Sequence, residues 1–219
     1  MKLEWSVVWD HRGVLFDGVL VTIGLTILTM IIAVPSGIVL AMMRLSNNKI
    51  LSGLSLAFVE FFRNVPLILV VYWAFYVMPI FLNIELSAFT TGIAALSLNV
   101  SAYNAETFRS GINSIRKGQT MAGLSLGMSH YQLYRDIIFP QAFRRIMPIL
   151  ASTWVSLFKD TSLVSVIAVG DLAHNALMIR SQTFRVLELL TAMALIYWAL
   201  GYPQAKLAEW VRQKFEVKE

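Results

Sequence analysis

Three polar side chains interrupt long apolar stretches of this 219-residue sequence: Arg63, Asn99 and Asp160. Charged and amide groups are costly in an apolar phase, so their presence there usually marks a binding site or a structural charge pair. A guanidinium group presents a fork of donors that matches a carboxylate. A carboxylate in turn can hold an ammonium group. Arg63 and Asp160 together therefore suit a zwitterionic ligand.

Neutral hydrogen-bonding residues lie close to these three in the sequence. Asn99 and Tyr103 are four residues apart, so they share one face if their segment is helical. Thr161 and Ser162 directly follow Asp160. The predicted ligand-binding residues are Arg63, Asn99, Tyr103, Asp160, Thr161 and Ser162.

Charge pairing without a ligand is the alternative explanation for these residues. Arg63 and Asp160 could neutralise each other, or they could pair with Glu60 and Lys159. Such pairs occur for structural reasons, because an unpaired charge is costly in an apolar phase. The sequence leaves both explanations open.

The remaining titratable residues favour structural roles. Glu106 and Arg109 are three residues apart, a spacing that brings opposite charges together on a helix. We expect them to form a structural or gating ion pair. His11, His130 and His174 are scattered over different segments, and none has a second ligand at metal spacing, so no metal site is predicted. The sequence contains no cysteine, which excludes disulfides and thiol catalysis.

The segments that carry these residues are predicted to cross a lipid bilayer. The sequence is 57% hydrophobic and 14% charged, whereas about a quarter of the residues in a soluble domain are charged. Crossing the bilayer takes about 20 mainly apolar residues per helix. The predicted spans are 18–43, 50–78, 87–112, 146–169 and 187–205, with an interruption of the fourth at 159–160. We predict an all-α integral membrane protein with about five transmembrane helices in a single domain, 1–219.

Two details refine this expectation. Ala33, Gly37 and Ala41 recur every four residues in the first span, and such small residues let another helix approach closely. Residues 1–17 contain two tryptophans among mixed charges, which favours a segment at the external membrane interface. No internal repeat is visible, so an inverted-repeat secondary transporter is not supported.

Basic residues predict the orientation of the chain. The segments 44–49, 106–145 and the tail from 206 hold twelve Lys and Arg residues, whereas 1–17 and 180–185 hold four. Cytoplasmic segments are enriched in Lys and Arg. We therefore expect the N-terminus outside and the C-terminus in the cytoplasm. The net charge of +5 is assigned to these loops and not to nucleic-acid binding.

The longest cytoplasmic segment, about 117–140, has a helical pattern of apolar residues. The members of this pattern follow i, i+3, i+7 and i+10 spacing and are Met121, Leu124, Met128 and Tyr131. Gly127 can end one short helix, and Pro140 suits the first turn of the next. We predict a helix–turn–helix, called here the elbow, whose exposed apolar ridge favours a protein partner.

The elbow resembles the coupling loop of permease subunits in ATP-binding cassette (ABC) importers. That loop reads Glu-Ala-Ala, three residues, Gly, nine residues, Ile, one residue, Leu-Pro. The matching positions are Ala122, Gly127, Ile137 and Pro140. The departures are Met121 for Glu, Gly123 for Ala and Phe139 for Leu. A salt bridge from the missing Glu to the ATPase is therefore not expected, while the shape of the elbow is.

Four further motifs are similar to the polar amino-acid branch of that family. They are Phe-Arg-Asn-Val-Pro-Leu at 62–67, Ala-Tyr-Asn-Ala-Glu at 102–106 followed by Arg109 and Gly-Ile at 111–112, Lys-Gly-Gln at 117–119, and Lys-Asp-Thr-Ser-Leu at 159–163. They occur in register across roughly 15–210. The resemblance implies a multi-pass permease of a bacterial inner membrane, with a second permease subunit, two cytoplasmic ATPases and an external amino-acid-binding protein.

The resemblance also implies roles for the elbow and for ATP. The residues expected to contact the ATPase are Gly118, Gln119, Met121, Ala122, Leu124, Gly127, Met128 and Tyr131. No Gly-x4-Gly-Lys-Ser/Thr phosphate loop occurs, so ATP and Mg are expected on the partner ATPase and no cofactor on this chain. The chain itself is expected to perform no bond chemistry.

Two other functional classes compete with this interpretation. A stand-alone secondary transporter or channel would explain the spans and the buried charges, but it would leave the elbow without a purpose. An intramembrane enzyme would need a nucleophile with a base; Asp160 with Ser162 is the pair that the sequence leaves open. The substrate favoured is glutamate, aspartate or an amide, because the spans carry no surplus acid for a cationic side chain.

Overall fold

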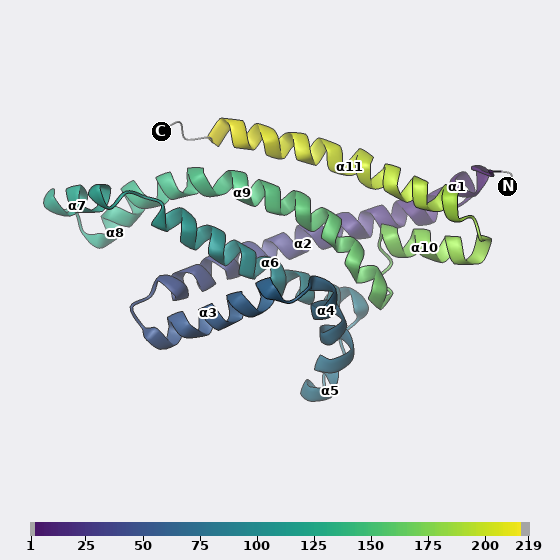
Figure 1. Ribbon diagram of the computed structural model, residues 1–219, viewed down its shortest axis with the longest axis horizontal. Helices are drawn as coiled ribbons and strands as arrows, with labels where there is room; N and C mark the ends of the chain where they lie inside the picture. The colour runs from purple at the N-terminus through teal and green to yellow at the C-terminus, as the bar shows by residue number, and fades with distance from the viewer. Residues whose placement is uncertain (1–2, 216–219) are drawn as a thin grey trace.

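The computed structural model describes residues 3–215, and all regular structure in that range is helical (Figure 1). In chain order the elements are α1 Ser6–Asp10, α2 Arg12–Leu45, α3 Lys49–Asn64, α4 Leu67–Tyr72, the π-helical turn η1 Trp73–Val77, α5 Met78–Leu82, α6 Ala88–Asn113, α7 Lys117–Ser125, α8 His130–Gln132, the π-helical η2 Leu133–Ile138, α9 Phe139–Asp160, the 3₁₀ helix η3 Thr161–Ile167, α10 Leu172–Thr183 and α11 Val186–Phe215. The predicted all-α fold class is confirmed.

Close contact between α2 and α6 forms the centre of the molecule. A Cβ atom at Gly37 would lie 2.6 Å from Cβ of Asn104 and 3.2 Å from the backbone nitrogen of Ala105. Ala33 and Ala41 are 0% and 1% exposed, and the Asn104 side chain donates to the carbonyl oxygen of Ala33 over 3.3 Å. The prediction that small residues of the first span admit a neighbouring helix is confirmed.

Length and apolar composition identify two single helices and two bent pairs as candidate membrane spans within 3–215. The single helices are α2 and α11, and the pairs are α3 with α4–α5 and α8–η3 with α10. The predicted third span, α6, does not meet the same criterion. Its buried residues include Thr91, Ser97 and Asn104, because α6 is surrounded by other helices and has little need of an apolar surface.

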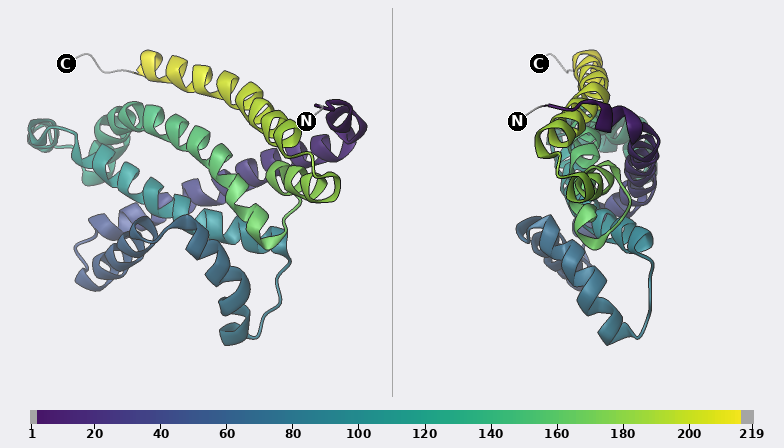
Figure 2. Two further views of the ribbon diagram at one scale, coloured as in Figure 1. Left: turned by 45° about the vertical axis from the view of Figure 1, so that its right-hand side comes forward. Right: turned by 90° about the vertical axis from the view of Figure 1, so that its right-hand side faces the viewer.

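The predicted second span is a bent pair of helices in the structure and not one straight helix. The chain turns by 108° between α3 and the helical arm formed by α4, η1 and α5. The far end of this arm, α5, projects away from the other helices (Figure 2). Proline lacks a backbone donor and disfavours helical geometry in the residue before it. Val65 and Pro66 accordingly have ψ angles of 130° and 131°.

The predicted interruption of the fourth span is present. The α-helix α9 ends at Asp160 and continues as the 3₁₀ helix η3. Ala168 then takes a left-handed conformation with φ of 61°, and α10 starts at Leu172 after a change of direction of 47°.

The N-terminal segment is held on the start of α11 by charged groups. The backbone nitrogen of Glu4 donates to the carboxylate of Glu188 over 3.0 Å, and Arg185 forms an ion pair with Glu4. Trp9 is 70% exposed. In Figure 1, α1 lies at one end of the long axis and α7 and α8 lie at the other, towards which the C-terminal end of α11 also runs.

Candidate functional site

A cavity with polar lining residues lies where the end of α3 meets α6 and α9. Its volume is about 560 Å³, which falls within the ~300–1,000 Å³ of typical small-molecule sites. The lining residues are Arg63, Asn64, Val65, Pro66, Leu67, Asn99, Val100, Tyr103, Ile149, Ser152, Thr153, Ser156, Leu157 and Asp160. The structure thus brings together four of the six predicted binding residues: Arg63, Asn99, Tyr103 and Asp160.

The other two predicted binding residues, Thr161 and Ser162, do not line the cavity. Thr161 is fully buried and its hydroxyl donates to the carbonyl oxygen of Phe158 over 2.8 Å. The Ser162 hydroxyl donates to the carbonyl oxygen of Lys159 over 2.8 Å. Both hydroxyls therefore satisfy carbonyls of the last turn of α9, where the helix changes to 3₁₀ geometry. The structure therefore does not bring these two residues to the cavity.

Sequence reasoning missed the hydroxyl residues of α9 that line the same cavity. Ser152, Ser156 and Asp160 are spaced by four residues, so they follow one face of the helix. Thr153 lies beside them and, like Ser152, donates to a carbonyl of its own helix. A hydroxyl oxygen that donates to the backbone still has lone pairs for a ligand. The four-residue spacing that ends at Asp160 was the signal available in the sequence.

Arg63 and Asp160 face the cavity without an ion-pair partner in the described residues. The charged atoms of these two side chains are not within 4.0 Å of any group of opposite charge between residues 3 and 215. The guanidinium carbon of Arg63 instead lies 5.6 Å from the centroid of the Tyr103 ring. Glu60 accepts a hydrogen bond from Asn64 over 3.1 Å. Within the part of the chain that the structure describes, none of the pairs that the structural alternative invoked forms an ion pair within 4.0 Å.

Asn99 and Tyr103 border the cavity from α6, but their donors are directed at α3. The Asn99 side chain donates from Nδ2 to the carbonyl oxygen of Phe62 over 2.8 Å. The Tyr103 hydroxyl donates to the carbonyl oxygen of Arg63 over 3.4 Å. Asn99 is 8% exposed and Tyr103 43%, so Tyr103 is the more open of the two to the cavity.

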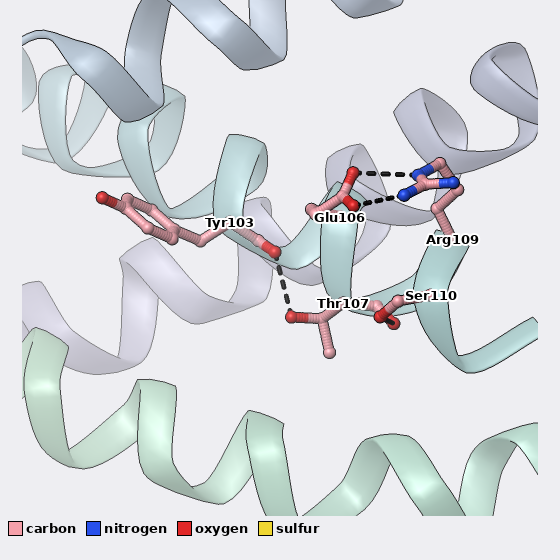
Figure 3. Close-up of polar contacts among 5 residues, drawn as sticks. All are labelled: Tyr103, Glu106, Thr107, Arg109 and Ser110. Atoms are coloured by element: carbon pink, nitrogen blue, oxygen red, sulfur yellow. Dashed lines mark hydrogen bonds and ion pairs between the residues drawn. The ribbon is translucent and has the colours of Figure 1, made fainter. Parts of the chain in front are cut away.

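The predicted ion pair between Glu106 and Arg109 is present on α6. Nε of Arg109 donates to Oε2 of Glu106 over 2.9 Å, and a second bond joins Nη2 to Oε1 (Figure 3). The two side chains are 28% and 31% exposed. Beside the pair on the same helix, the Thr107 hydroxyl donates to the carbonyl oxygen of Tyr103. A gating role for the pair remains a prediction.

The elbow has the predicted helix–turn–helix form. Gly127, between α7 and α8, has φ of 78°, a conformation that glycine adopts without steric cost. A capping box of Ser129 and Gln132 then starts α8, and Pro140 lies in the first turn of α9.

The inner face of the elbow packs against the helices behind it. Leu133 is 0% exposed, and a Cβ at Gly123 would lie 2.7 Å from its Cδ1. A larger residue at Gly123 would therefore require the Leu133 side chain to shift. The side chain of Gln141, on α9, donates to that of Gln119 over 3.1 Å. Gln119 therefore contributes to holding the elbow as well as lying on its surface.

The outer face of the elbow carries exposed apolar side chains. Met121, Leu124 and Tyr131 are 63%, 43% and 72% exposed, as the ridge prediction requires. Met128 is only half-buried and contacts the Gly123 region. The most exposed apolar residue of the elbow, Leu126 at 82%, was missed because it lies outside the helical pattern.

Comparisons with known proteins place the chain in a family. The family model for the binding-protein-dependent transport system inner membrane component matches residues 33–217. The glutamate/aspartate import permease protein GltK of Escherichia coli is 31% identical over 220 residues, covering 97% of this chain and 98% of its own. The probable glutamine ABC transporter permease protein GlnP of Bacillus subtilis is 38% identical over 198 residues, covering 88% of this chain and 89% of its own.

A solved structure agrees with these relatives. The crystal structure of an amino acid ABC transporter with histidines matches with a TM-score of 0.91 at 31% identity, covering 98% of this chain and 100% of that chain. Permeases of this kind are non-catalytic, and the ATPase is a separate subunit. The chain belongs to the family of inner-membrane components of binding-protein-dependent transport systems, and within it to the permeases of amino-acid ABC importers.

Proposed function

We propose that this chain forms one half of the translocation pathway of an ATP-driven importer for a polar amino acid, which an external binding protein delivers. The observation that supports this proposal is the cavity in which Arg63 and Asp160, opposite in charge and not paired with each other, lie with hydroxyl and amide groups. Such a lining matches a zwitterion better than it matches an ion of a single sign.

Each of the two charged residues binds one end of the substrate. Arg63 binds the α-carboxylate through its guanidinium fork, and Asp160 takes the α-ammonium group. Ser152, Ser156 and Thr153 line the same cavity and offer hydroxyl oxygens to the rest of the molecule. Relatives named for glutamate and aspartate and for glutamine agree with an acidic amino acid or its amide as the substrate, and a relative named for arginine is 31% identical as well.

The partners follow from the exposed surfaces of the chain. The ridge of the elbow docks on a cytoplasmic ATPase dimer. That dimer binds ATP and Mg, because this sequence contains no phosphate-binding loop. The chain pairs in the membrane with a second permease subunit, and no cofactor binds to this chain. The whole of 1–219 acts as a single permease domain.

ATP-driven uptake tests this function. The chain is reconstituted in liposomes with its ATPase and second permease subunit, ATP and Mg are trapped inside, and the binding protein is added outside. Glutamate, glutamine and arginine are supplied separately as labelled substrates. We expect uptake of one acidic or amide amino acid that stops when ATP or the binding protein is omitted. Uptake that continues without ATP would instead show the secondary transporter.

Single cysteines introduced into this cysteine-free chain test the orientation. The excess of basic residues predicts that the elbow is cytoplasmic, and α1 lies at the opposite end of the molecule (Figure 1). A Phe184→Cys variant, at a residue 81% exposed between α10 and α11, should react with an impermeant maleimide in intact cells. A Ser129→Cys variant should react only after permeabilisation. Labelling of Ser129→Cys in intact cells would contradict the predicted topology, because it would place the elbow outside the cell.

A further inference from the structure

The broken end of α3 leaves backbone carbonyls that its own helix cannot satisfy. The last carbonyl groups of a helix have no intrahelical donor. The carbonyl oxygen of Phe61 still accepts from the backbone nitrogen of Val65 over 3.0 Å. The next carbonyl, that of Phe62, would need a donor from residue 66, but Pro66 has no N–H. The carbonyl of Arg63 would need the nitrogen of Leu67, which the extended backbone at Val65 and Pro66 carries out of helical register.

Two side chains of α6 provide the missing donors in order. Asn99 donates to the carbonyl oxygen of Phe62 over 2.8 Å, and Tyr103 donates to the carbonyl oxygen of Arg63 over 3.4 Å. Residues four apart on one helix thus satisfy two successive carbonyls of another. We call this pair the Asn99–Tyr103 clamp.

The clamp matters because of where the break lies. The helices α3 and α4–α5 form one candidate span, so the break falls inside it. Unsatisfied carbonyls are costly within a membrane, and irregular backbone is tolerated there only where protein or a hydrated cavity surrounds it. Without the clamp, the carbonyl of Arg63 could gain the nitrogen of Leu67 as a donor if the chain straightened around residues 64–67. The carbonyl of Phe62 would have to reach water, because Pro66 has no N–H in any conformation.

The same residues also fix the side chain of Arg63. Its carbonyl is bound by the Tyr103 hydroxyl, its neighbour's carbonyl is bound by Asn99, and its guanidinium carbon lies 5.6 Å from the centroid of the Tyr103 ring. A guanidinium group within about 6 Å of an aromatic ring is attracted to its face. Side chains of α6 therefore contact both the backbone and the guanidinium group of Arg63.

We propose that Asn99 and Tyr103 are positioning residues, which hold the helix break at Pro66 and thereby place the guanidinium of Arg63 in the cavity. The proposal deepens the proposed function and rests on it for the role of Arg63. It also changes the role of Asn99. Because one of the two Nδ2 hydrogens is committed to Phe62, Asn99 retains one N–H and its carbonyl oxygen, and the oxygen is an acceptor suited to the ammonium end.

Spin labels across the break measure its geometry in the reconstituted complex. Cysteines replace Gly53 on α3, where an added Cβ atom would have no neighbour within 4 Å, and Ile80 on α5, which is 79% exposed. Straightening a chain that is bent by 108° lengthens the distance between the two labels. Asn99→Leu and Tyr103→Leu remove the clamp. Tyr103→Phe is milder, because it keeps the ring and removes only the hydroxyl.

We expect Tyr103→Leu to lengthen and broaden the distance distribution, and Asn99→Leu to broaden it. They should also raise the half-saturating amino-acid concentration for stimulated ATP hydrolysis by about tenfold, with a smaller change in maximal rate. Tyr103→Phe should shift both quantities in the same direction by less. Thr107→Val is the matched control: its hydroxyl donates within α6 to the carbonyl of Tyr103, so both quantities should stay at the wild-type values.

Unchanged label distances in Asn99→Leu and Tyr103→Leu would overturn the proposal, whether or not ATP hydrolysis falls. A fall in stimulated ATP hydrolysis without a change in the distance between the labels would show that the two residues bind the substrate directly. Failure of the proposed function is distinguishable, because no amino acid would then stimulate the wild-type complex. The label distances would still report on the clamp in that case.

Discussion

Replacing Arg63 with alanine is expected to lower amino-acid uptake by roughly ten- to hundredfold while the protein still folds and inserts. A charge-assisted hydrogen-bonded pair contributes about 1.5–3 kcal/mol, and each ~1.4 kcal/mol is a tenfold change in affinity. Arg63 lines the cavity and has no carboxylate partner in the described residues, so its removal takes away a ligand contact without leaving an orphaned acid.

Two further variants make the Arg63 experiment specific. Arg63→Lys keeps the positive charge but loses the planar fork, and we expect uptake between that of the wild type and Arg63→Ala. Lys159→Ala removes a cation next to Asp160 that is exposed and does not line the cavity, so its uptake should remain near the wild-type rate. Wild-type uptake by Arg63→Ala would contradict the assignment of the α-carboxylate to this residue.

Replacing Gly127 with valine is expected to uncouple ATP hydrolysis from the amino acid. The residue has φ of 78°, where a β-branched side chain is strained by about 1–3 kcal/mol. Relief of that strain moves α7 relative to α8 and distorts the ridge that faces the ATPase. Amino-acid-stimulated hydrolysis and uptake should fall at least about tenfold, by the same free-energy scale, with normal membrane insertion.

Asparagine provides the matched rescue for Gly127. It tolerates the left-handed conformation better than other residues, so Gly127→Asn should retain most of the stimulated hydrolysis. Gly24→Ala controls for the loss of a glycine elsewhere, because a Cβ atom added at this position on α2 would have no neighbour within 4 Å. Normal transport by Gly127→Val would remove the turn from the coupling mechanism.

Features with a local cause were predictable from the sequence. Glycine at a turn, proline at a helix start and the apolar ridge together predicted the elbow, because each is a property of a few adjacent residues. The ion pair of Glu106 and Arg109 follows from helical spacing in the same way. The meeting of Arg63 and Asp160 in one cavity followed from the cost of burying polar groups in separate spans.

Features that depend on the surroundings of a helix were not predictable in the same way. Pro66 was visible in the sequence, yet a turn of 108° depends on donors that α6 supplies from 37 and 40 residues away. Hydropathy marks contact with lipid, so the polar helix α6, which contacts protein, falls below the apolar criterion. Thr161 was placed in the site by adjacency to Asp160, but one residue turns a side chain by about 100° on a helix.

The structural explanation for Arg63 and Asp160 makes a distinct forecast that one experiment can separate from substrate binding. If the two charges merely neutralise each other, each single replacement leaves an unpaired charge and lowers folded yield, and removing both restores yield and function. If they bind the two ends of an amino acid, removing both removes the site. Folded yield and ATP-driven uptake must therefore be measured on the same preparations.

The most direct measurement is the uptake of the wild-type substrate by the Arg63→Ala, Asp160→Ala double variant, normalised to the amount of folded protein in the liposomes. Both side chains line the cavity of about 560 Å³, and neither forms an ion pair with the other in the described residues. The account predicts a well-folded double variant whose uptake is no higher than that of Arg63→Ala alone. Recovery of uptake to near the wild-type rate in the double variant would contradict it.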